Sequence, residues 1–308
     1  MAFGDSPILS VSVASETTVR IKPCEPVFVI LDVTAGSSRD QETMREPPPE
    51  LARHVLVNDR SYGARMTGVN AVAFFLLNKS SVKTIDDDIK SFQVVAIMYW
   101  NAEDEDYLFN SPGLYHVEFH PEARVDVIVE QPTREEQRIV AQMEDLGVVF
   151  ALFVLDPTDY NRGKAVSPRV EQMLEEHPDT AYTRYLSIPL GIYKFYKERP
   201  KPGPDRERYL VERRKVKKYF EPYCKGEIKS LLEAGAAYHL AMIELEESRA
   251  GPHGRSPEAE TTRRHAIALL EKVKNSPYAV DLRSKAEYEL RELRKASPPR
   301  PSSDRHEP

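Results

Sequence analysis

The chain has 308 residues, of which 41% are hydrophobic and 30% charged, and its formal net charge is −6. This length is sufficient for two domains, and the composition is typical of a globular protein. No apolar run approaches the roughly 18 residues that span a bilayer, so we expect no transmembrane segment. Residues 1–19 lack a basic start and a continuous apolar run, so a secretory signal is not expected there either.

From Ile8 to about Glu130, apolar residues recur with period two between turn residues, which predicts β-strands. The stretches Ala71–Leu77 and Val94–Trp100 are the most apolar, and we expect them to be central strands of a sheet. Near the end of this region, Leu114–His120 and Val125–Val129 alternate on either side of a short turn. That pattern predicts an antiparallel hairpin.

The Pro-Gly-x-Tyr-x-Val stretch at Pro112–Val117, followed by the Val-rich strand, resembles the last two strands of bacterial immunoglobulin-like domains. The resemblance implies an antiparallel β-sandwich over residues 1–131. It also implies that Tyr115 is a buried corner tyrosine whose hydroxyl bonds back to the chain. The stretch Cys24–Ser37 is similar to an early strand of these domains, with Cys24 where they usually have glycine.

The apolar period changes at Pro132, and we place the domain boundary at residues 130–133. Thr133 and Glu136 have the spacing of a capping box, which predicts the start of a helix. One helical stripe then follows at steps of four and three: Ile139, Met143, Leu146, Phe150 and Phe153.

Further helices are expected up to residue 296. A short one begins at Ser167-Pro168 and ends at the Pro178-Asp179 break, and the next is expected to kink at Pro189. Segment 199–205 is expected to be a linker. Four more helices follow, over 206–220, 227–247, 257–274 and 278–293, and the proline-rich tail 297–308 is expected to be disordered.

The stretches Val170–Tyr196 and Ala266–Leu293 both predict a helix, a short proline-containing turn and a second helix. They resemble the tetratricopeptide-like repeats of bacterial outer-membrane-assembly lipoproteins. The resemblance implies an all-α array of helical hairpins over 132–296, with a concave face that docks peptides or protein segments. It also implies an extracytoplasmic (cell-envelope) location. The fold class expected for the whole chain is therefore α+β, in two domains and a tail.

Charge is unevenly distributed. Residues 1–131 hold 11 Lys+Arg against 20 Asp+Glu, whereas residues 194–225, here called the basic belt, hold 12 against 5. The cations of the basic belt are interleaved with aromatic residues, a combination that suits an anionic polymer or nucleic acid. The other interpretation is structural: Val216, Tyr219 and Phe220 share one side of a helix and the cations face water.

Signatures of chemistry are missing from the sequence: there is no G-x-S-x-G, phosphate-binding Gly-Lys-Ser/Thr, G-x-G-x-x-G or H-E-x-x-H motif. We therefore expect no enzyme, no catalytic residue, no metal and no cofactor. The acidic runs 86–88 and 103–106 are interpreted as solvated turns, and His177, His239 and His265 as structural or surface residues. Cys24 and Cys224 fall in different predicted domains, so no disulfide between them is predicted, and two cysteines are too few for a four-ligand zinc site.

The predicted function is a non-enzymatic interaction or scaffold module that docks a protein or peptide on its helical domain. Binding of an anionic polymer or nucleic acid by the basic belt is the alternative. Aromatic and arginine side chains are the usual anchors of interfaces. The candidate binding residues are therefore Arg184, Tyr193, Lys194, Arg213, Arg214, Lys217 and Lys218.

Overall fold

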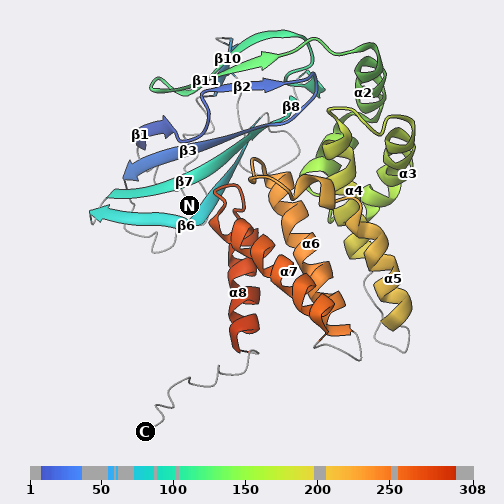
Figure 1. Cartoon of the computed structure of the whole chain (residues 1–308). Helices are drawn as coiled ribbons and strands as arrows, with labels where there is room; N and C mark the ends of the chain where they lie inside the picture. The colour runs from blue at the N-terminus through green and yellow to red at the C-terminus, as the bar shows by residue number, and fades with distance from the viewer. Residues whose placement is uncertain are drawn as a thin grey trace.

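The computed structural model describes residues 8–36, 55–58, 60–61, 73–86, 89–101, 104–197, 206–250 and 256–295. The fold class is α+β: β-sheets occupy the N-terminal half and helices the C-terminal half (Figure 1). Segment 199–205 and the tail 297–308 lie outside the described residues, so the linker and disorder expected there stay predictions.

Two main sheets form the N-terminal part. One has the order β1 (Ile8–Val13), β3 (Val27–Gly36), β7 (Ile89–Met98) and β6 (Ala73–Asp86). The other has the order β2 (Thr18–Ile21), β11 (Ala123–Val129), β10 (Gly113–His120), β4 (Leu56–Val57) and β5 (Arg60–Ser61). A small ribbon pairs β8 (Trp100–Asn101) with β9 (Asp106–Tyr107). The described pairs are antiparallel except β2 with β11, which run parallel.

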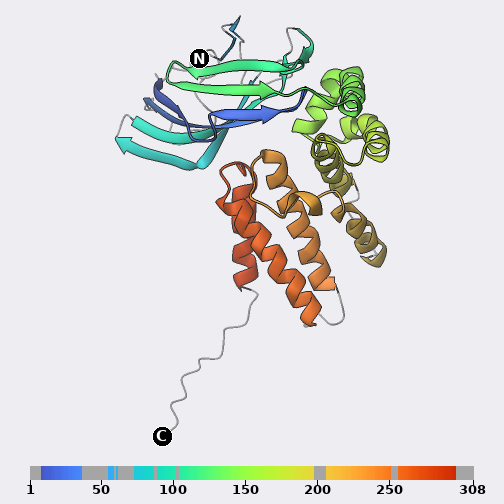
Figure 2. The ribbon, with the colours of Figure 1, turned by 45° about the horizontal axis from the view of Figure 1, so that its top comes forward.

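The two sheets lie over each other and enclose one apolar core, as Figure 2 shows. The core consists of the apolar side chains that recur at every second position of the strands. Leu31 and Val94 from one sheet belong to it together with Val117 and Val127 from the other, and each is at most 1% exposed. The alternation in the sequence therefore identified the inward face of these strands correctly, because successive side chains of a strand point to opposite faces.

The hairpin expected near the end of this region is confirmed as β10 and β11, with Tyr115 opposite Val127. The Tyr115 hydroxyl donates to the Ser111 carbonyl oxygen at 2.9 Å, so the expected bond back to the chain is present. The ring is only half-buried, packing edge-on against Phe109, and the expected full burial was therefore wrong.

One strand lies at a different place in the sheet from the one expected. β7 is central, between β3 and β6, but β6 has only β7 as a neighbour among the described strands. The expectation that 71–77 forms a central strand was wrong for the part that is described. An apolar run indicates burial of the faces of a strand and does not tell how many neighbours its edges have.

The change from strand to helix falls where the sequence predicts it. β11 ends at Val129 and α2 begins at Arg134. Thr133 accepts the Glu136 amide at 3.2 Å, and the Glu136 carboxylate accepts the Thr133 amide at 2.7 Å, so the capping box is complete. Whether the parts on either side fold independently stays a prediction.

Seven α-helices are described in the C-terminal half. They are α2 (Arg134–Leu155), α3 (Tyr160–Glu176), α4 (Thr183–Lys197), α5 (Arg206–Lys217), α6 (Leu231–Ala250), α7 (Pro257–Asn275) and α8 (Leu282–Lys295), with a 3-10 turn η1 (Glu221–Tyr223) after α5. Most agree with the expected segments to within a few residues.

Two helices differ from the sequence-based expectation. α2 contains the predicted stripe but is interrupted at Gly147, whose φ of 51° and ψ of −139° are not helical. α3 begins at Tyr160 rather than at Ser167-Pro168, because Asp159 caps it by accepting the Arg162 amide at 3.0 Å. Pro168 consequently lies inside the helix, and the Ser-Pro pair was not a start signal.

The two expected helical hairpins have turns of equal length. α3 ends at Glu176 and α4 begins at Thr183, while α7 ends at Asn275 and α8 begins at Leu282. Each turn places proline at its second position, Pro178 and Pro277. α4 contains Pro189 and continues to Lys197.

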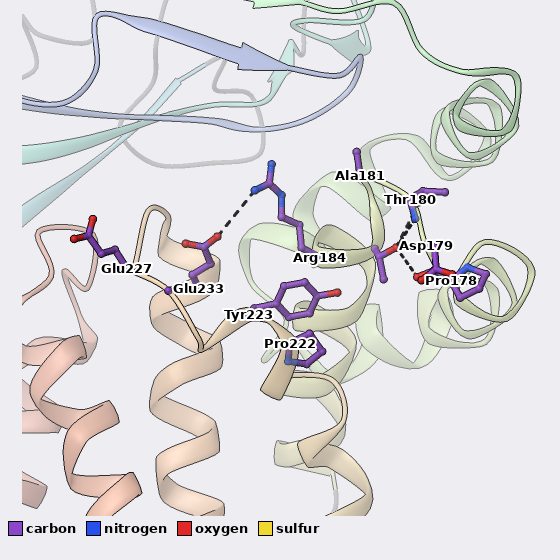
Figure 3. Close-up of a pocket in the computed structure, with 11 residues that line it drawn as sticks. Pro178, Asp179, Thr180, Ala181, Arg184, Pro222, Tyr223, Glu227 and Glu233 are labelled. Carbon is purple, nitrogen blue, oxygen red and sulfur yellow. Dashed lines mark hydrogen bonds and ion pairs between the residues drawn. The ribbon is translucent and has the colours of Figure 1, made fainter.

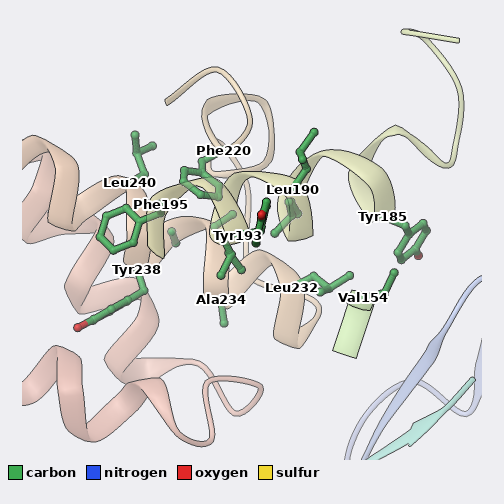
Figure 4. Close-up of a cluster of buried hydrophobic side chains, with 14 of the residues drawn as sticks. Val154, Tyr185, Leu190, Tyr193, Phe195, Phe220, Leu232, Ala234, Tyr238 and Leu240 are labelled. Carbon is green, nitrogen blue, oxygen red and sulfur yellow. The ribbon is translucent and has the colours of Figure 1, made fainter. Parts of the chain in front are cut away.

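The helices share a second apolar cluster, part of which is drawn in Figure 4. Close helix packing is set by Gly163 on α3, where any Cβ atom would collide with the ring of Tyr193 on α4. Tyr193 is 2% exposed as a result. The cluster also takes in four residues from the N-terminal part of the chain: Cys24, Tyr99, Trp100 and Tyr107.

The sheets and helices are thus joined by a buried contact. Two hydrogen bonds cross it: the Tyr182 hydroxyl donates to the Pro23 carbonyl oxygen at 2.7 Å, and the Tyr107 hydroxyl donates to the Met143 carbonyl oxygen at 3.2 Å. Cys24 and Cys224 are both free and buried, Cys24 within this contact and Cys224 among the helices.

Candidate functional site

A pocket of about 690 Å³ opens in the helical part, between the α3–α4 turn, η1 and the start of α6 (Figure 3). Concave sites with a few converging polar groups are the usual location of binding function. Its lining residues are Pro178, Asp179, Thr180, Ala181, Thr183, Arg184, Pro222, Tyr223, Gly226, Glu227 and Glu233.

The α3–α4 turn forms one wall, and its own hydrogen bonds hold it. The Thr183 hydroxyl donates to the Pro178 carbonyl oxygen at 3.1 Å and accepts the Thr180 amide at 3.1 Å. Threonine side chains commonly satisfy the backbone groups of a turn in this way. The turn therefore delivers Arg184 to the first turn of α4, facing the pocket.

The start of α6 forms the opposite wall and positions Glu233. The Ser230 hydroxyl accepts the Glu233 amide at 3.2 Å, while the Glu233 carboxylate accepts the Lys229 amide at 2.7 Å. A carboxylate in the first turn of a helix is favoured by the free amides and the helix dipole. Glu233 is thereby held in place at the wall of the pocket.

Arg184 lies at the centre of the site. One terminal nitrogen is 4.0 Å from a Glu233 oxygen and the other is 3.7 Å from a Glu25 oxygen, and the guanidinium carbon is 4.7 Å from the centre of the Tyr185 ring. These ion pairs are longer than direct hydrogen bonds. Arg184 therefore connects the pocket to the N-terminal part of the chain, since Glu25 belongs to the turn before β3.

Two further carboxylates, Asp179 and Glu227, border the pocket and are exposed. Neither makes an ion pair with a described residue. The lining thus carries three carboxylates and one guanidinium, and that guanidinium already faces Glu233 and Glu25. The pocket is acidic in net charge.

The basic belt lies against carboxylates of α6. Lys217 is 3.2 Å from Glu247 and 3.6 Å from Glu244, and Arg214 is 3.2 Å from Glu247. No local pattern predicts this pairing, because about 30 residues of the chain separate the cations from Glu244 and Glu247. The cations compensate an acidic stripe of the neighbouring helix.

Arg213 is 3% exposed and forms part of the helical core. Its guanidinium carbon is 3.5 Å from the centre of the Phe195 ring, and its Nε donates to the Tyr209 hydroxyl at 2.7 Å. Glu246 accepts the Tyr209 hydroxyl at 2.9 Å and is 3.6 Å from Arg213. Stacking on aromatic rings is how a buried guanidinium is commonly accommodated.

The structure does not bring the seven candidate binding residues together in one site. Arg184 alone lines the pocket. Tyr193 is a core residue, Lys194 pairs with Glu171 on α3, and Lys218 is exposed with its Nζ 5.0 Å from the centre of the Tyr219 ring.

Sequence reasoning missed Glu25, Asp179, Glu227 and Glu233. The stretch Cys24-Glu25-Pro26 was singled out as part of a strand, but the partner of Glu25 follows 159 residues later. The Ser230–Glu233 spacing, a serine with a glutamate three residues later, was the one local signal for the position of Glu233.

Among the described residues, no group of histidine, cysteine or carboxylate side chains is arranged to hold a metal ion. No described helix combines the length and apolar character that crossing a bilayer requires. No protein-family model, curated protein or solved structure matches the chain.

Proposed function

We propose that this protein is a non-enzymatic interaction module that docks a basic segment of a partner protein in the pocket beside Arg184. In this proposal the N-terminal part is an immunoglobulin-like sandwich and the C-terminal part a tetratricopeptide-like array. Two sheets around one core, the Tyr115 bond to Ser111 and the equal turns of the two hairpins support these assignments.

The net charge of the pocket carries the proposal. Asp179 and Glu227 have no cationic partner among the described residues, and Arg184 is shared between Glu233 and Glu25. A lysine or arginine side chain of a partner would find carboxylates at both ends of the pocket. An acidic segment would meet repulsion there, and charge complementarity of this kind decides between partners.

Binding of an anionic polymer by the basic belt is less well supported. Arg213, Arg214 and Lys217 face carboxylates of α6. A polyanion would have to compete with those carboxylates for each cation. We therefore retain protein docking as the proposed function.

Selection of a random-heptapeptide phage library on the immobilised full chain tests the proposal. We expect selected peptides to contain lysine or arginine, and their affinity to fall as salt rises. The double variant Asp179→Asn/Glu227→Gln should bind the selected peptides about tenfold more weakly, at roughly 0.5–1 kcal/mol for each exposed pair.

The control is Glu122→Gln/Glu258→Gln, which removes two exposed charges far along the chain from the pocket residues. It should leave the affinity unchanged. Selection of acidic peptides, or equal binding by the pocket variant and the control, would contradict the proposal.

A further inference from the structure

The turn from Lys22 to Glu25 is inserted between the sheets and the helices. Cys24 is 1% exposed and Glu25 is 2% exposed. Cys24 has a left-handed φ of 62°, a conformation that favours glycine, the residue usual at this position in immunoglobulin-like domains. On the sheet side, the Cys24 amide donates to the Phe109 carbonyl oxygen at 2.8 Å. On the helical side, Tyr182 bonds to the Pro23 carbonyl. The turn is therefore fixed to both parts of the molecule.

The Glu25 carboxyl is poorly compensated for a group so deeply buried. Its Oε2 accepts the Lys22 amide at 2.9 Å. Its Oε1 has no hydrogen-bond partner among the described residues, and the nearest cationic nitrogen, on Arg184, is 3.7 Å away. A charged carboxylate in such a place loses its hydration without full replacement.

Other titratable groups face Glu25 from each element packed on it. Lys22 is 3.6 Å from both Glu130 and Glu136, so its charge is shared. Among the described residues this set comprises Lys22 and Cys24 from the same turn, Tyr99 from the sheet side, Glu136 from α2, and Tyr182, Arg184 and Tyr185 from the start of α4, with Glu233 behind Arg184.

We propose that Glu25 is a proton-dependent latch between the two parts of the chain: protonated, it holds the sheets against the helices, and ionised, it favours their separation.

The direction follows from burial. Burial raises the pKa of Glu25 from 4.5 to about 7, against the opposing effects of Arg184 and of the Lys22 amide. When the parts separate, Glu25 reaches water and its pKa returns to the ordinary value. The closed state therefore binds the proton more tightly, and the opening equilibrium rises with pH. Between pH 6 and pH 8 the opening constant should increase about tenfold.

Opening of the junction can be measured by chemical labelling of the two cysteines. Cys24 lies in the latch, whereas Cys224 is buried among the helices, with its thiol hydrogen-bonded to the Phe220 carbonyl oxygen. The rate at which a thiol reagent labels each one in the full chain reports how often that site opens. Dividing the wild-type rate by that of Glu25→Gln at each pH removes the ionisation of the thiol itself.

We expect this ratio to rise about tenfold for Cys24 between pH 6 and pH 8 and to stay constant for Cys224. A Cys24 ratio that is constant over this range, or a Cys224 ratio that rises in parallel, would overturn the latch. If Glu25→Gln does not fold, the labelling rate of Cys24 in the folded wild type can be divided by its labelling rate in the urea-unfolded wild type at the same pH. This ratio also removes the ionisation of the thiol and should show the same rise. No ligand is needed, so this test is independent of the proposed docking function.

Discussion

Two buried side chains allow the junction between sheets and helices to be compared with the core of the helical part: Glu25 at the junction and His239 in the helical core. Burial raises the pKa of Glu25 to about 7 and lowers the pKa of His239 to about 4. The cause is the same in both, since removing a group from water disfavours its charged form. An acid and a base therefore move in opposite directions, and both are neutral near pH 6.

Their surroundings differ in how well they suit the neutral form. His239 Nδ1 donates to the Gly235 carbonyl oxygen at 2.7 Å, and its Nε2 lies 3.3 Å from the Tyr196 hydroxyl, which donates to it. The neutral imidazole thus uses both nitrogens, and the rings of Phe195 and Phe220 pack on it. Glu25 has one oxygen without a hydrogen bond, so the surroundings of His239 satisfy its polar atoms and those of Glu25 do not.

The two pKa shifts predict that the acid side of the pH–stability curve reports on the helical core and the alkaline side on the junction. A lowered histidine pKa contributes stability above pH 6.5 that is lost as the pH falls toward 4. A raised carboxyl pKa contributes stability below pH 4.5 that is lost as the pH rises through 7. Linkage therefore predicts that acid weakens the helical core first and alkali weakens the junction first.

The largest effect is expected on the acid side. Between pH 7 and pH 3.5 the free energy of unfolding should fall by about 3 kcal/mol because of His239 alone. His239→Gln cannot take up the proton and should lack this part of the loss in urea titrations followed by circular dichroism. The control is His265→Gln, since the side chain of His265 is half-exposed beside Glu244. Equal acid sensitivity of the two variants would contradict the assignment.

The next largest effect is expected on the alkaline side, where Glu25→Gln tests the contribution of the junction to the unfolding free energy. From pH 5 to pH 8 the wild type should lose about 2.5 kcal/mol of unfolding free energy through Glu25, whereas the glutamine variant should not. The measurement is the difference between the two urea midpoints at each pH. If that difference is independent of pH, the burial of Glu25 has no consequence for stability.

Two tyrosine hydroxyls allow a hydrogen bond at the junction to be compared with one inside the N-terminal part, on β10. Tyr182→Phe removes the bond to the Pro23 carbonyl, and because Tyr182 is 0% exposed, no water replaces it. We expect a loss of about 2 kcal/mol. Tyr115→Phe removes a similar bond to Ser111 from a half-buried ring and should cost about 0.5–1.5 kcal/mol. Thermal unfolding of both variants tests the order, and a larger loss for Tyr115 would reverse it.

The smallest effect is expected in the basic belt. Arg214 pairs with Glu247 while 60% of its side chain is exposed to solvent. Arg214→Gln should change the unfolding free energy by about 0.5 kcal/mol or less, and 1 M salt should remove the difference. A loss above about 1.5 kcal/mol in urea titrations at low salt would show that exposed pairing contributes more here than in typical proteins.

Local patterns were enough to predict most of the elements. The period-two alternation identified β10 and β11, and the Thr133–Glu136 spacing identified the start of α2. These predictions succeeded because the interactions concerned lie within a few residues along the chain. The start of α3 was missed because two capping signals competed, and Asp159 prevailed over Ser167.

Only the tertiary structure decided what the charged residues do. The sequence by itself determined that residues 194–225 are basic and that Cys24-Glu25-Pro26 precedes a strand. It could not determine that α6 supplies the carboxylates beside Arg214 and Lys217, or that Glu25 faces Arg184 across the junction. The energy of a charge depends on its distance to other charges and on its access to water. Both quantities are set by segments far apart in the sequence that meet only when the chain folds.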